Sequence, residues 1–330
     1  MNLDMVSRVQ KVLDLRREIS TQLDDLINRD YILLGLPYYL NPGDILIWEG
    51  ERDYLRSRGF RCLNEGRRYR DYGKIREDTL ILLQGGGNFG DLYRSVQNER
   101  LEIIQRHRKN PIVVLPVSCW YTNADLLRQD AEILAEHPEL TLCARDAVSF
   151  EFLKQYFSNR ILLVPDMAFG VEVGRLKQYM TGDNQGILYL KRTDKELASN
   201  GPPLRAKLLA AAEVRDWPDM ESPPKCWGRF HRLDRLADEV GERRGLYRLS
   251  LKIMQLADWY YHRRCRKQLI LHGVRFLSRY RDIYTTRLHG GILSILLDKG
   301  VTIIDNSYGK NSNFFKTWLS DTEGVKLWKQ

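Results

Sequence analysis

Two kinds of apolar pattern alternate along the chain. Residues 4–28 place apolar side chains about every 3.6 positions between charged ones, which predicts an amphipathic helix. Short, nearly continuous apolar runs are typical of strands that are buried on both faces of a parallel sheet. Further helices are expected at 97–108, 125–136, 146–156, 249–267, 291–297 and 314–319. Strands are expected at 31–36, 79–84, 111–117, 141–144, 161–164, 187–190, 214–217, 268–272, 282–286 and 301–305.

This alternation predicts an α/β fold with mostly parallel sheets. Segment 170–184 is richer in glycine and polar residues, and we expect the chain to cross there between two domains, 1–174 and 175–330. Stretches 200–203 and 218–224 predict irregular connections in the second domain. Open parallel sheets bind ligands at the carboxyl ends of their strands, so a ligand is expected in a crevice that both domains share.

Glycines follow the expected strand 79–84, in the run Gly85-Gly86-Gly87-Asn88. Glycine lets the backbone approach a ligand closely and exposes its N–H groups. The spacing matches neither a dinucleotide fingerprint nor a Walker loop, and a tight structural turn remains an alternative. Earlier, Asn41-Pro42-Gly43-Asp44 predicts a turn in which Asp44 caps a helix that starts near residue 45.

Basic residues follow two expected strands of the second domain. Arg287 and His289 lie between strand 282–286 and a helix that starts at the next glycines, where free N–H groups and the helix dipole favour an anion. Lys191 and Arg192 follow strand 187–190, so Arg192 and Arg287 are expected on the same rim of one sheet. The alternative for Arg287 and His289 is an ordinary surface pair, and the alternative for Lys191 and Arg192 is a solvated charged loop.

The 330 residues carry a formal net charge of +9, which favours an anionic partner: nucleic acid, a membrane surface or a phosphorylated substrate. The five cysteines are scattered without a C-x-x-C pair, so neither a disulfide framework nor a zinc knuckle is predicted. No cluster of ligand residues predicts a metal. Neither a signal-peptide core nor an apolar stretch of about 20 residues is present, and we expect a cytoplasmic protein.

Segment 228–281 is strongly basic, with fourteen Lys or Arg against five Asp or Glu, and aromatic residues are interleaved with them. One interpretation is a solvated helical face whose aromatic side chains belong to the core. The other is a surface that rests on an anionic membrane, which would suit a lipid-linked sugar acceptor. Nucleic-acid binding is not expected, because no recognition motif accompanies the composition.

Ordered motifs along most of the chain resemble the polysaccharide pyruvyl transferase family. These motifs are Asn41-Pro42-Gly43-Asp44, Gly85-Gly86-Gly87-Asn88, Leu115-Pro116-Val117-Ser118, Ala144-Arg145-Asp146 with Ser149, Pro165-Asp166, Arg192-x-Asp194-x-Glu196 and Arg287-Leu288-His289-Gly290. Ser118 follows valine where the family often has glutamine, and Asp146 stands where glutamate is usual. Residues 197–281 carry no resemblance.

The resemblance implies two Rossmann-like domains in the arrangement of the B-type glycosyltransferases, with the acceptor side in 1–174 and the donor site in 175–330. It also implies phosphoenolpyruvate as donor substrate, no cofactor, and a cyclic pyruvate ketal on a sugar of a polysaccharide or its precursor. Arg192, Arg287 and His289 correspond to the donor-binding set, with Arg287 and His289 as the catalytic candidates. The neighbouring motifs add these substrate contacts: Lys191, Gly86, Gly87, Asn88, Asn41, Asp44 and Ser118.

Such chemistry requires a concentration of positive charge for the phosphate and carboxylate, and arginine can contact each of them in a bidentate manner. His289 is the natural general acid because its ordinary pKa lies near neutrality, although it could equally be a phosphate ligand. Four aspartates are candidate bases for the sugar hydroxyls, and helix capping or salt bridging is the alternative role for each: Asp44, Asp91, Asp166 and Asp194.

Two other functions remain open from the sequence. One is a glycosyltransferase of the same fold with a nucleotide-sugar donor, and the other is a non-catalytic anion-binding protein. For the transferase, the expected partners are phosphoenolpyruvate and a sugar or lipid-linked oligosaccharide acceptor. Peripheral contact with the inner face of the membrane is compatible with the basic segment.

Overall fold

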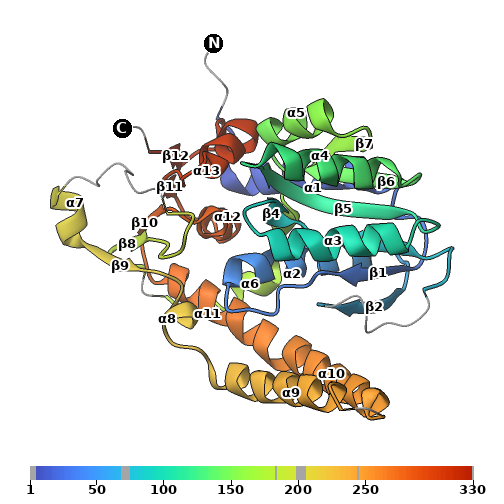
Figure 1. Cartoon of the computed structure of the whole chain (residues 1–330). Helices are drawn as coiled ribbons and strands as arrows, with labels where there is room; N and C mark the ends of the chain where they lie inside the picture. The colour runs from blue at the N-terminus through green and yellow to red at the C-terminus, as the bar shows by residue number, and fades with distance from the viewer. Residues whose placement is uncertain (1–4, 68–74, 183, 198–205, 244, 329–330) are drawn as a thin grey trace.

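Two parallel β-sheets organise the computed structural model of this chain (Figure 1). The structure describes residues 5–67, 75–182, 184–197, 206–243 and 245–328. Every strand pair in both sheets is parallel, which agrees with the continuous apolar runs of the sequence. The architecture is consistent with two Rossmann-like domains.

The first sheet has seven strands in the order β2-β1-β3-β5-β6-β7, and β4 pairs with β5. Its strands are β1 (Tyr31–Leu34), β2 (Cys62–Gly66), β3 (Leu80–Leu83), β4 (Gly86–Gly90), β5 (Ile112–Trp120), β6 (Leu140–Ala144) and β7 (Arg160–Leu163). The helices of this half are α1 (Arg8–Leu23), α2 (Pro42–Ser57), α3 (Arg94–Arg106), α4 (Ala124–Ala135), α5 (Ala147–Tyr156), the 3₁₀ helix η2 (Met167–Gly170) and α6 (Val173–Lys177).

The second sheet has five strands in the order β12-β11-β10-β8-β9. Its strands are β8 (Ile187–Leu190), β9 (Ala212–Arg215), β10 (Asp282–Thr285), β11 (Val301–Ile303) and β12 (Val325–Leu327). The helices of this half are α7 (Ala206–Ala211), α8 (Pro218–Glu221), α9 (Lys225–Gly241), α10 (Tyr247–Tyr260), the π-helix η3 (Tyr261–Cys265), α11 (Arg266–Ser278), α12 (Leu288–Leu296), α13 (Lys310–Phe314) and the π-helix η4 (Phe315–Leu319).

The strand order of each sheet reverses at its first strand. In the first sheet β1 lies between β2 and β3, and in the second β8 lies between β9 and β10. Loops that leave the two strands on either side of such a point run in opposite directions, which opens a crevice at the carboxyl ends of those strands. The connections after β1, β3, β8 and β10 are therefore the places where this fold positions ligand-binding residues.

Alternate residues of the first sheet enter two different hydrophobic clusters. Ile81 and Leu83 of β3 pack with α3, α4 and α5 on one face, whereas Leu80 and Leu82 pack on the opposite face with α1 and α2. The cluster on that opposite face continues without interruption into the second sheet. Helices α2, α11 and α12 contact one another within it, so the two halves share one core.

The structure confirms most of the predicted elements, but the strand predicted at 268–272 is wrong. That segment lies within α11, which follows α10 and η3 in one continuous helical run (Figure 1). Residues Leu269, Gly273 and Leu277 are buried at four-residue spacing, which is the period of a helix. The short apolar run 269–271 resembles a strand only when this longer period is overlooked.

The N-terminal cap of α2 also differs from the prediction. The helix begins at Pro42 rather than near residue 45, and Asn41 is the capping residue, with its side chain accepting a hydrogen bond from the Gly43 N–H. Asp44 lies inside the first turn, where its charge complements the helix dipole. Proline is favoured at this first helical position because its missing N–H would have no intrahelical partner.

Several elements were absent from the sequence prediction. Strands β2 and β12 have few apolar residues, and α9 follows a proline-rich stretch that masks its start. Part of the stretch expected to be irregular, 218–224, forms the short helix α8, and α6 lies in the predicted crossing segment. The predicted connection 200–203 and the first residue of the predicted helix 4–28 lie outside the described residues.

Replacing Gly50 with alanine is expected to destabilise the fold by about 3 kcal/mol, because overpacking a rigid contact forces the backbone to move. Its new Cβ would lie 1.7 Å from the Met167 carbonyl oxygen, where α2 crosses η2. The measurement is the free energy of unfolding in urea. In the control, Gly228→Ala in α9, the new Cβ meets open space. This control should be neutral or stabilising by up to about 1 kcal/mol, and equal losses in both variants would contradict the packing argument.

Candidate active site

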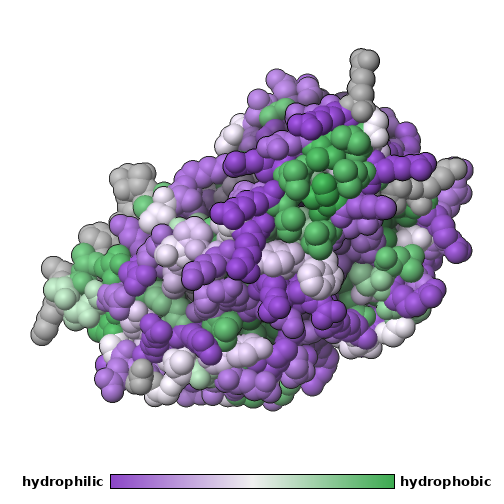
Figure 2. Space-filling view, turned by 90° about the horizontal axis from the view of Figure 1, so that it is seen from below, coloured by the Kyte–Doolittle hydropathy of each residue, from purple (hydrophilic) through white to green (hydrophobic). Residues whose placement is uncertain are grey.

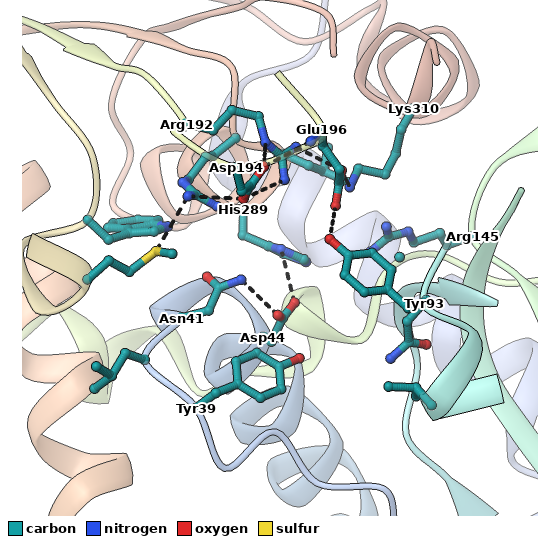
Figure 3. Close-up of a pocket in the computed structure, with 18 residues that line it drawn as sticks. Tyr39, Asn41, Asp44, Tyr93, Arg145, Arg192, Asp194, Glu196, His289 and Lys310 are labelled. Carbon is teal, nitrogen blue, oxygen red and sulfur yellow. Dashed lines mark hydrogen bonds and ion pairs between the residues drawn. The ribbon is translucent and has the colours of Figure 1, made fainter. Parts of the chain in front are cut away.

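A cavity of about 510 Å³ lies where the carboxyl ends of the two sheets meet (Figure 3). The first half contributes residues that follow β1 and residues of β4, together with Arg145 after β6. The second half contributes residues that follow β8, β10 and β11. The side chains and backbone that line the cavity belong to Tyr39, Leu40, Asn41, Asp44, Gly87, Asn88, Tyr93, Val96, Arg145, Arg192, Asp194, Glu196, Trp217, Met220, Arg287, Leu288, His289 and Lys310.

The N-termini of two helices reach this cavity. Asn41 and Asp44 at the start of α2 line it, as do Arg287 and His289 at the start of α12. The first N–H groups of a helix have no intrahelical acceptor and carry the positive end of the helix dipole. Two such termini at one cavity favour an anionic ligand.

The two helix termini touch through a position that only glycine can occupy. A Cβ placed on Gly43 of α2 would lie 2.7 Å from the Cβ of His289 and 3.0 Å from its Nδ1. The absence of a side chain therefore allows the imidazole of α12 to pack against the first turn of α2. This close approach sets the position of His289 relative to both halves of the molecule.

The two ring nitrogens of His289 have different surroundings. Its Nε2 lies 3.2 Å from Oδ2 of the buried Asp166. Its Nδ1 lies 4.0 Å from Oδ1 of Asp44 (Figure 3). An ionised Asp166 only accepts hydrogen bonds, so Nε2 is the nitrogen that carries the proton of the neutral ring. Nδ1 is then the nitrogen that can take up or release a proton at the cavity.

Asp166 and Arg145 form a buried ion pair behind His289. Arg145 Nη1 donates to Asp166 Oδ2 over 2.7 Å, and each side chain is only 1% exposed. Burial alone would raise the pKa of Asp166, but the His289 ring and the Arg145 guanidinium hold the pKa well below its usual range. Arg145 Nε donates to Ser118, so Nη2 remains directed toward Gly87 at the cavity.

Glu196 is the acceptor for five donors at the opposite wall. The phenols of Tyr93 and Tyr308, the amide of Asn306, the guanidinium of Arg192 and the ammonium of Lys310 all donate to its carboxylate. Burial would raise the pKa of Glu196, but Lys310 and Arg192 lower it below the usual range. Tyr93 belongs to the first half, so this carboxylate also links the two halves.

The two arginines predicted as donor-binding residues are both held by carboxylates. Arg192 Nε donates to Asp194 over 2.7 Å, and its Nη1 donates to Glu196 over 2.8 Å. Arg287 donates through Nε and Nη2 to Asp216, at 2.6 Å for Nη2. Among the described residues, Nη1 of Arg287 has no hydrogen-bond acceptor.

The structure brings most of the predicted site residues together. Seven of them line the cavity: Asn41, Asp44, Gly87, Asn88, Arg192, Arg287 and His289. Three others do not line it. Ser118 lies behind Arg145, Gly86 faces Ile47 of α2, and Lys191 is absent from the wall although its neighbour Arg192 is present. Substrate binding by these ten residues stays a prediction.

The candidate bases differ in their surroundings. Asp91 accepts hydrogen bonds from Thr122 and from the Asn123 N–H, away from the cavity wall. Asp166 is saturated by Arg145, His289 and the Ala168 N–H. Asp44, which Asn41 orients through a 2.7 Å hydrogen bond, is the aspartate closest to Nδ1 of His289.

The sequence prediction missed two cations and the extent of charge pairing. Arg145 stands in a motif of the sequence without a predicted role, and Lys310 belongs to no motif. Both belong to the cavity wall, and every one of its four cations has a carboxylate partner. The expected concentration of positive charge is present, and carboxylates nearly balance it. The position of Asp216 directly after β9 is the signal that could have revealed the partner of Arg287.

These features define the chain as an α/β protein with two parallel sheets and a cavity lined by four cations at their facing carboxyl ends. Residues 41–308 match the family described as polysaccharide pyruvyl transferase. The match spans more than half of the chain, and the chain belongs to the polysaccharide pyruvyl transferase family. Family membership supports transfer of a pyruvyl group onto a polysaccharide.

Relatives from a bacterium and a yeast are similar along most of the chain. One relative is a Bacillus subtilis protein that is provisionally described as pyruvyl transferase EpsO. It is 33% identical over 328 residues, which cover 98% of this chain and 94% of that protein. Pyruvyl transferase 1 of Schizosaccharomyces pombe is 28% identical over 306 residues, covering 87% of this chain and 69% of that protein.

The crystal structure of a functionally uncharacterised Klebsiella pneumoniae protein has a similar fold. It superposes with a TM-score of 0.58 and 17% sequence identity over the whole of both chains. In the parts of the chain described above, no helix combines the length and apolarity needed to cross a membrane. The same parts contain no group of three or more His, Cys, Asp or Glu side chains arranged to hold a metal ion.

Acid is expected to destabilise the protein through Asp166 and Glu196. Their pKa values are lower in the folded chain than the ordinary values of about 4. The stability that they contribute is therefore complete above about pH 4 and is lost as the pH falls below it. Asp166→Asn should lower the free energy of unfolding at neutral pH by about 3–5 kcal/mol, because the buried charge of Arg145 then lacks its partner. The same variant should lose less free energy of unfolding than the wild type as the pH falls.

The measurement is the free energy of unfolding in urea between neutral and acidic pH. Asp125→Asn in α4 is the matched control, because the Asp125 side chain is exposed and lies 3.5 Å from Arg128. Its loss should be no more than about 1 kcal/mol. A wild-type acid profile that Asp166→Asn reproduces without change would contradict the assignment.

Proposed function

We propose that this protein transfers pyruvate from phosphoenolpyruvate to a sugar and forms a cyclic ketal. The observation that carries the proposal is the arrangement of His289, whose Nε2 is held by buried Asp166 while Nδ1 faces a cavity walled by cations. A group that moves a proton thus lies beside groups that bind a phosphate and a carboxylate. Family membership supports the pyruvyl group as the moiety transferred.

The donors that remain after internal pairing are suited to a small anion with two charged groups. Nη1 of Arg287 and Nη2 of Arg145 make no hydrogen bond to any residue in the described ranges, and both arginines line the cavity. Lys310 keeps donors beyond the one that it gives to Glu196. We assign the phosphate and carboxylate of phosphoenolpyruvate to these donors and to the helix termini.

The paired carboxylates have a role in this arrangement. Each one holds a guanidinium in a fixed orientation, so little side-chain entropy is lost when the remaining N–H groups bind the donor. A nearly balanced network also limits the net attraction for anions in general. Selectivity then depends on the positions of the free N–H groups more than on the total charge.

The proposed reaction conserves atoms and charge. The methylene carbon of phosphoenolpyruvate accepts a proton and becomes the methyl group, while a sugar hydroxyl adds to the adjacent cationic carbon and releases its own proton. The bond from that carbon to the phosphate oxygen then breaks, and phosphate leaves. A second hydroxyl of the sugar then adds to the same carbon, and the released phosphate takes up its proton to become hydrogen phosphate.

Nδ1 of His289 is the proposed proton donor to the methylene carbon. Asp166 accepts a hydrogen bond from Nε2 and holds the ring in position, so that the proton leaves from the nitrogen that faces the cavity. Asp44, 4.0 Å from Nδ1, is the proposed acceptor for a hydroxyl proton. The alternative role of His289 is that of a phosphate ligand. A variant without a titratable group at this position can distinguish a proton donor from a phosphate ligand.

The two sheets are proposed to correspond to the two domains of a B-type glycosyltransferase arrangement, with the boundary near residue 174. The acceptor would then enter along α2 and β4, and the donor would bind at α12. A glycosyltransferase with a nucleotide-sugar donor is the competing function. The cavity contains two tyrosines and Trp217, which could contact a base. The free N–H groups of Arg145 and Arg287 instead favour a small anion with two charged groups.

Phosphoenolpyruvate is expected to raise the melting temperature of the wild-type protein, whereas UDP-sugars are not. A ligand at about one hundred times its Kd stabilises the folded state by about 2.7 kcal/mol. The measurement is a thermal melt at increasing ligand concentration, with inorganic phosphate as the control for a nonspecific anion. Stabilisation by UDP-sugars alone would favour the glycosyltransferase.

Replacing His289 with asparagine is expected to lower kcat by about 10²–10⁴-fold, with a small change in KM for phosphoenolpyruvate. Asparagine keeps an amide near the position of Nδ1 but cannot transfer a proton. The assay is phosphate release with a panel of sugar acceptors, followed by mass spectrometry of the product. A raised KM with unchanged kcat would assign His289 to phosphate binding instead.

Replacing Arg287 with alanine is expected to abolish transfer, but it also leaves Asp216 buried without its partner. The double variant Arg287→Ala/Asp216→Asn removes that charge and should recover the melting temperature without recovering transfer. Wild-type rates in this double variant would refute the role of Arg287. Donor-induced stabilisation without phosphate release from any acceptor would identify a non-catalytic binding protein.

A further inference from the structure

Helices α9 and α10 form an antiparallel hairpin that projects along the lower side of the molecule (Figure 1). The hairpin belongs mainly to the basic segment 228–281, where the sequence carries no recognisable motif. It takes no part in either sheet, and only one of its faces packs against the rest of the chain. The buried residues of α10 are Ser250, Met254 and Ala257, which mark the inward face.

The outward face of α10 carries an apolar stripe. Leu249, Leu256 and Trp259 follow one another at helical spacing and are 48%, 50% and 55% exposed. Leu236 of α9 and Leu246 at the tip of the hairpin are also exposed. Figure 2 views the molecule from below, the side on which the hairpin lies in Figure 1, and shows a compact hydrophobic patch bordered by hydrophilic side chains.

Cations surround this stripe. Lys252 lies between Leu249 and Leu256 on α10. Arg263 and Arg264 follow the end of the stripe, in η3. Exposed arginines also follow the outward side of α9, at Arg229, Arg232, Arg235 and, after its end, Arg243. Exposed acidic side chains on the hairpin are few and gather near its tip, at Asp238, Glu239 and Glu242. The border of the apolar patch is therefore predominantly positive.

The hairpin is held firmly against the wall of the candidate active site. The phenol of Tyr261 in η3 donates to the carbonyl oxygens of Pro37 and Tyr39, at 3.1 Å in each case. Its ring stacks on Tyr38 with the centroids 4.4 Å apart. These residues belong to the loop that leads from β1 into α2 and lines the cavity through Tyr39. The outward face of the hairpin therefore has a fixed orientation relative to the cavity.

We propose that the outward face of the α9–α10 hairpin docks on an anionic phospholipid surface. An apolar stripe with a basic border is the pattern of a helix that lies in the membrane interface, with leucine and tryptophan among the acyl chains and with lysine and arginine at the headgroups. The charge also argues against a second copy of this chain, because two such faces would oppose like charges. A nucleic acid offers no apolar counterpart for the stripe.

Docking of the hairpin would give its contact with the β1–α2 loop a role, because that loop lines the cavity. A surface that binds the bilayer through α10 places the β1–α2 loop at a fixed height above it. An acceptor anchored in that bilayer would be presented at a constant distance from the cavity, and this consequence rests on the proposed function. The docking itself does not depend on it.

Wild-type protein is expected to co-sediment with vesicles of phosphatidylcholine that contain phosphatidylglycerol, and to remain in solution with phosphatidylcholine alone. High salt should weaken the binding, because each cation near an anionic surface contributes roughly five-fold to the partition coefficient. Binding that ignores the anionic lipid content would overturn the proposal. Concentration-dependent dimerisation, measured by light scattering and abolished by changes in the stripe, would also overturn it.

The double variant Leu249→Gln/Leu256→Gln tests the apolar stripe. It should lower the partition coefficient at least about ten-fold, because two leucine side chains no longer enter the acyl region. The matched control is Val148→Gln/Leu63→Gln, which alters two side chains of the first half that are 57% and 48% exposed. Circular dichroism and melting temperature verify folding in both. Equal vesicle binding by the two double variants would refute the assignment.

A fluorescence measurement locates the contact without relying on a loss of binding. Vesicles with brominated acyl chains should quench the emission of Trp259 in the wild-type protein, because bromine quenches only tryptophans that enter the acyl region. The variant Trp259→Phe should lose that quenching and keep most of the binding. Quenching of equal size in Trp259→Phe would show that another part of the molecule enters the bilayer.

Discussion

The Asp166 carboxylate is the contact on which the candidate site depends. Its Oδ2 accepts from Arg145 of the first half and from His289 of the second, so one buried acid joins both sheets. A buried carboxylate is stable only when charge and hydrogen bonds compensate for its desolvation. This requirement fixes the rotamers of both partners, and Gly43 provides the space in which the imidazole lies.

Charge pairing is the second organising feature. Arg192, Arg287 and Lys310 are all oriented by carboxylates, and Glu196 alone receives hydrogen bonds from five side chains. A network of this kind is rigid because breaking any pair leaves a buried charge. The free N–H groups at the cavity are consequently preorganised, and the same rigidity extends to the hairpin through Tyr261 and the β1–α2 loop.

Local sequence patterns were sufficient to predict the central strands of the sheets but not the strands at their edges. Runs such as Leu80–Leu83 are apolar throughout because helices cover both faces of the sheet, and this pattern has few alternatives. Strand β2 is largely exposed, so its sequence lacks this signal. The run 269–271 is ambiguous by itself, and only its packing against α2 and α12 within a longer helix decides between helix and strand.

The sequence by itself determined the parallel α/β fold and the family. It also placed Arg192, Arg287 and His289 after strands, because the succession of strands and helices along the chain and the spacing of glycines are local properties. Only the tertiary structure decided the partner of each cation. Asp216 lies 71 positions from Arg287, and Asp166 lies 123 positions from His289. Asp216 and Arg287 come together because β9 and β10 lie in one sheet, and Asp166 meets His289 because the two sheets pack together. No local pattern encodes which carboxylate will face which cation.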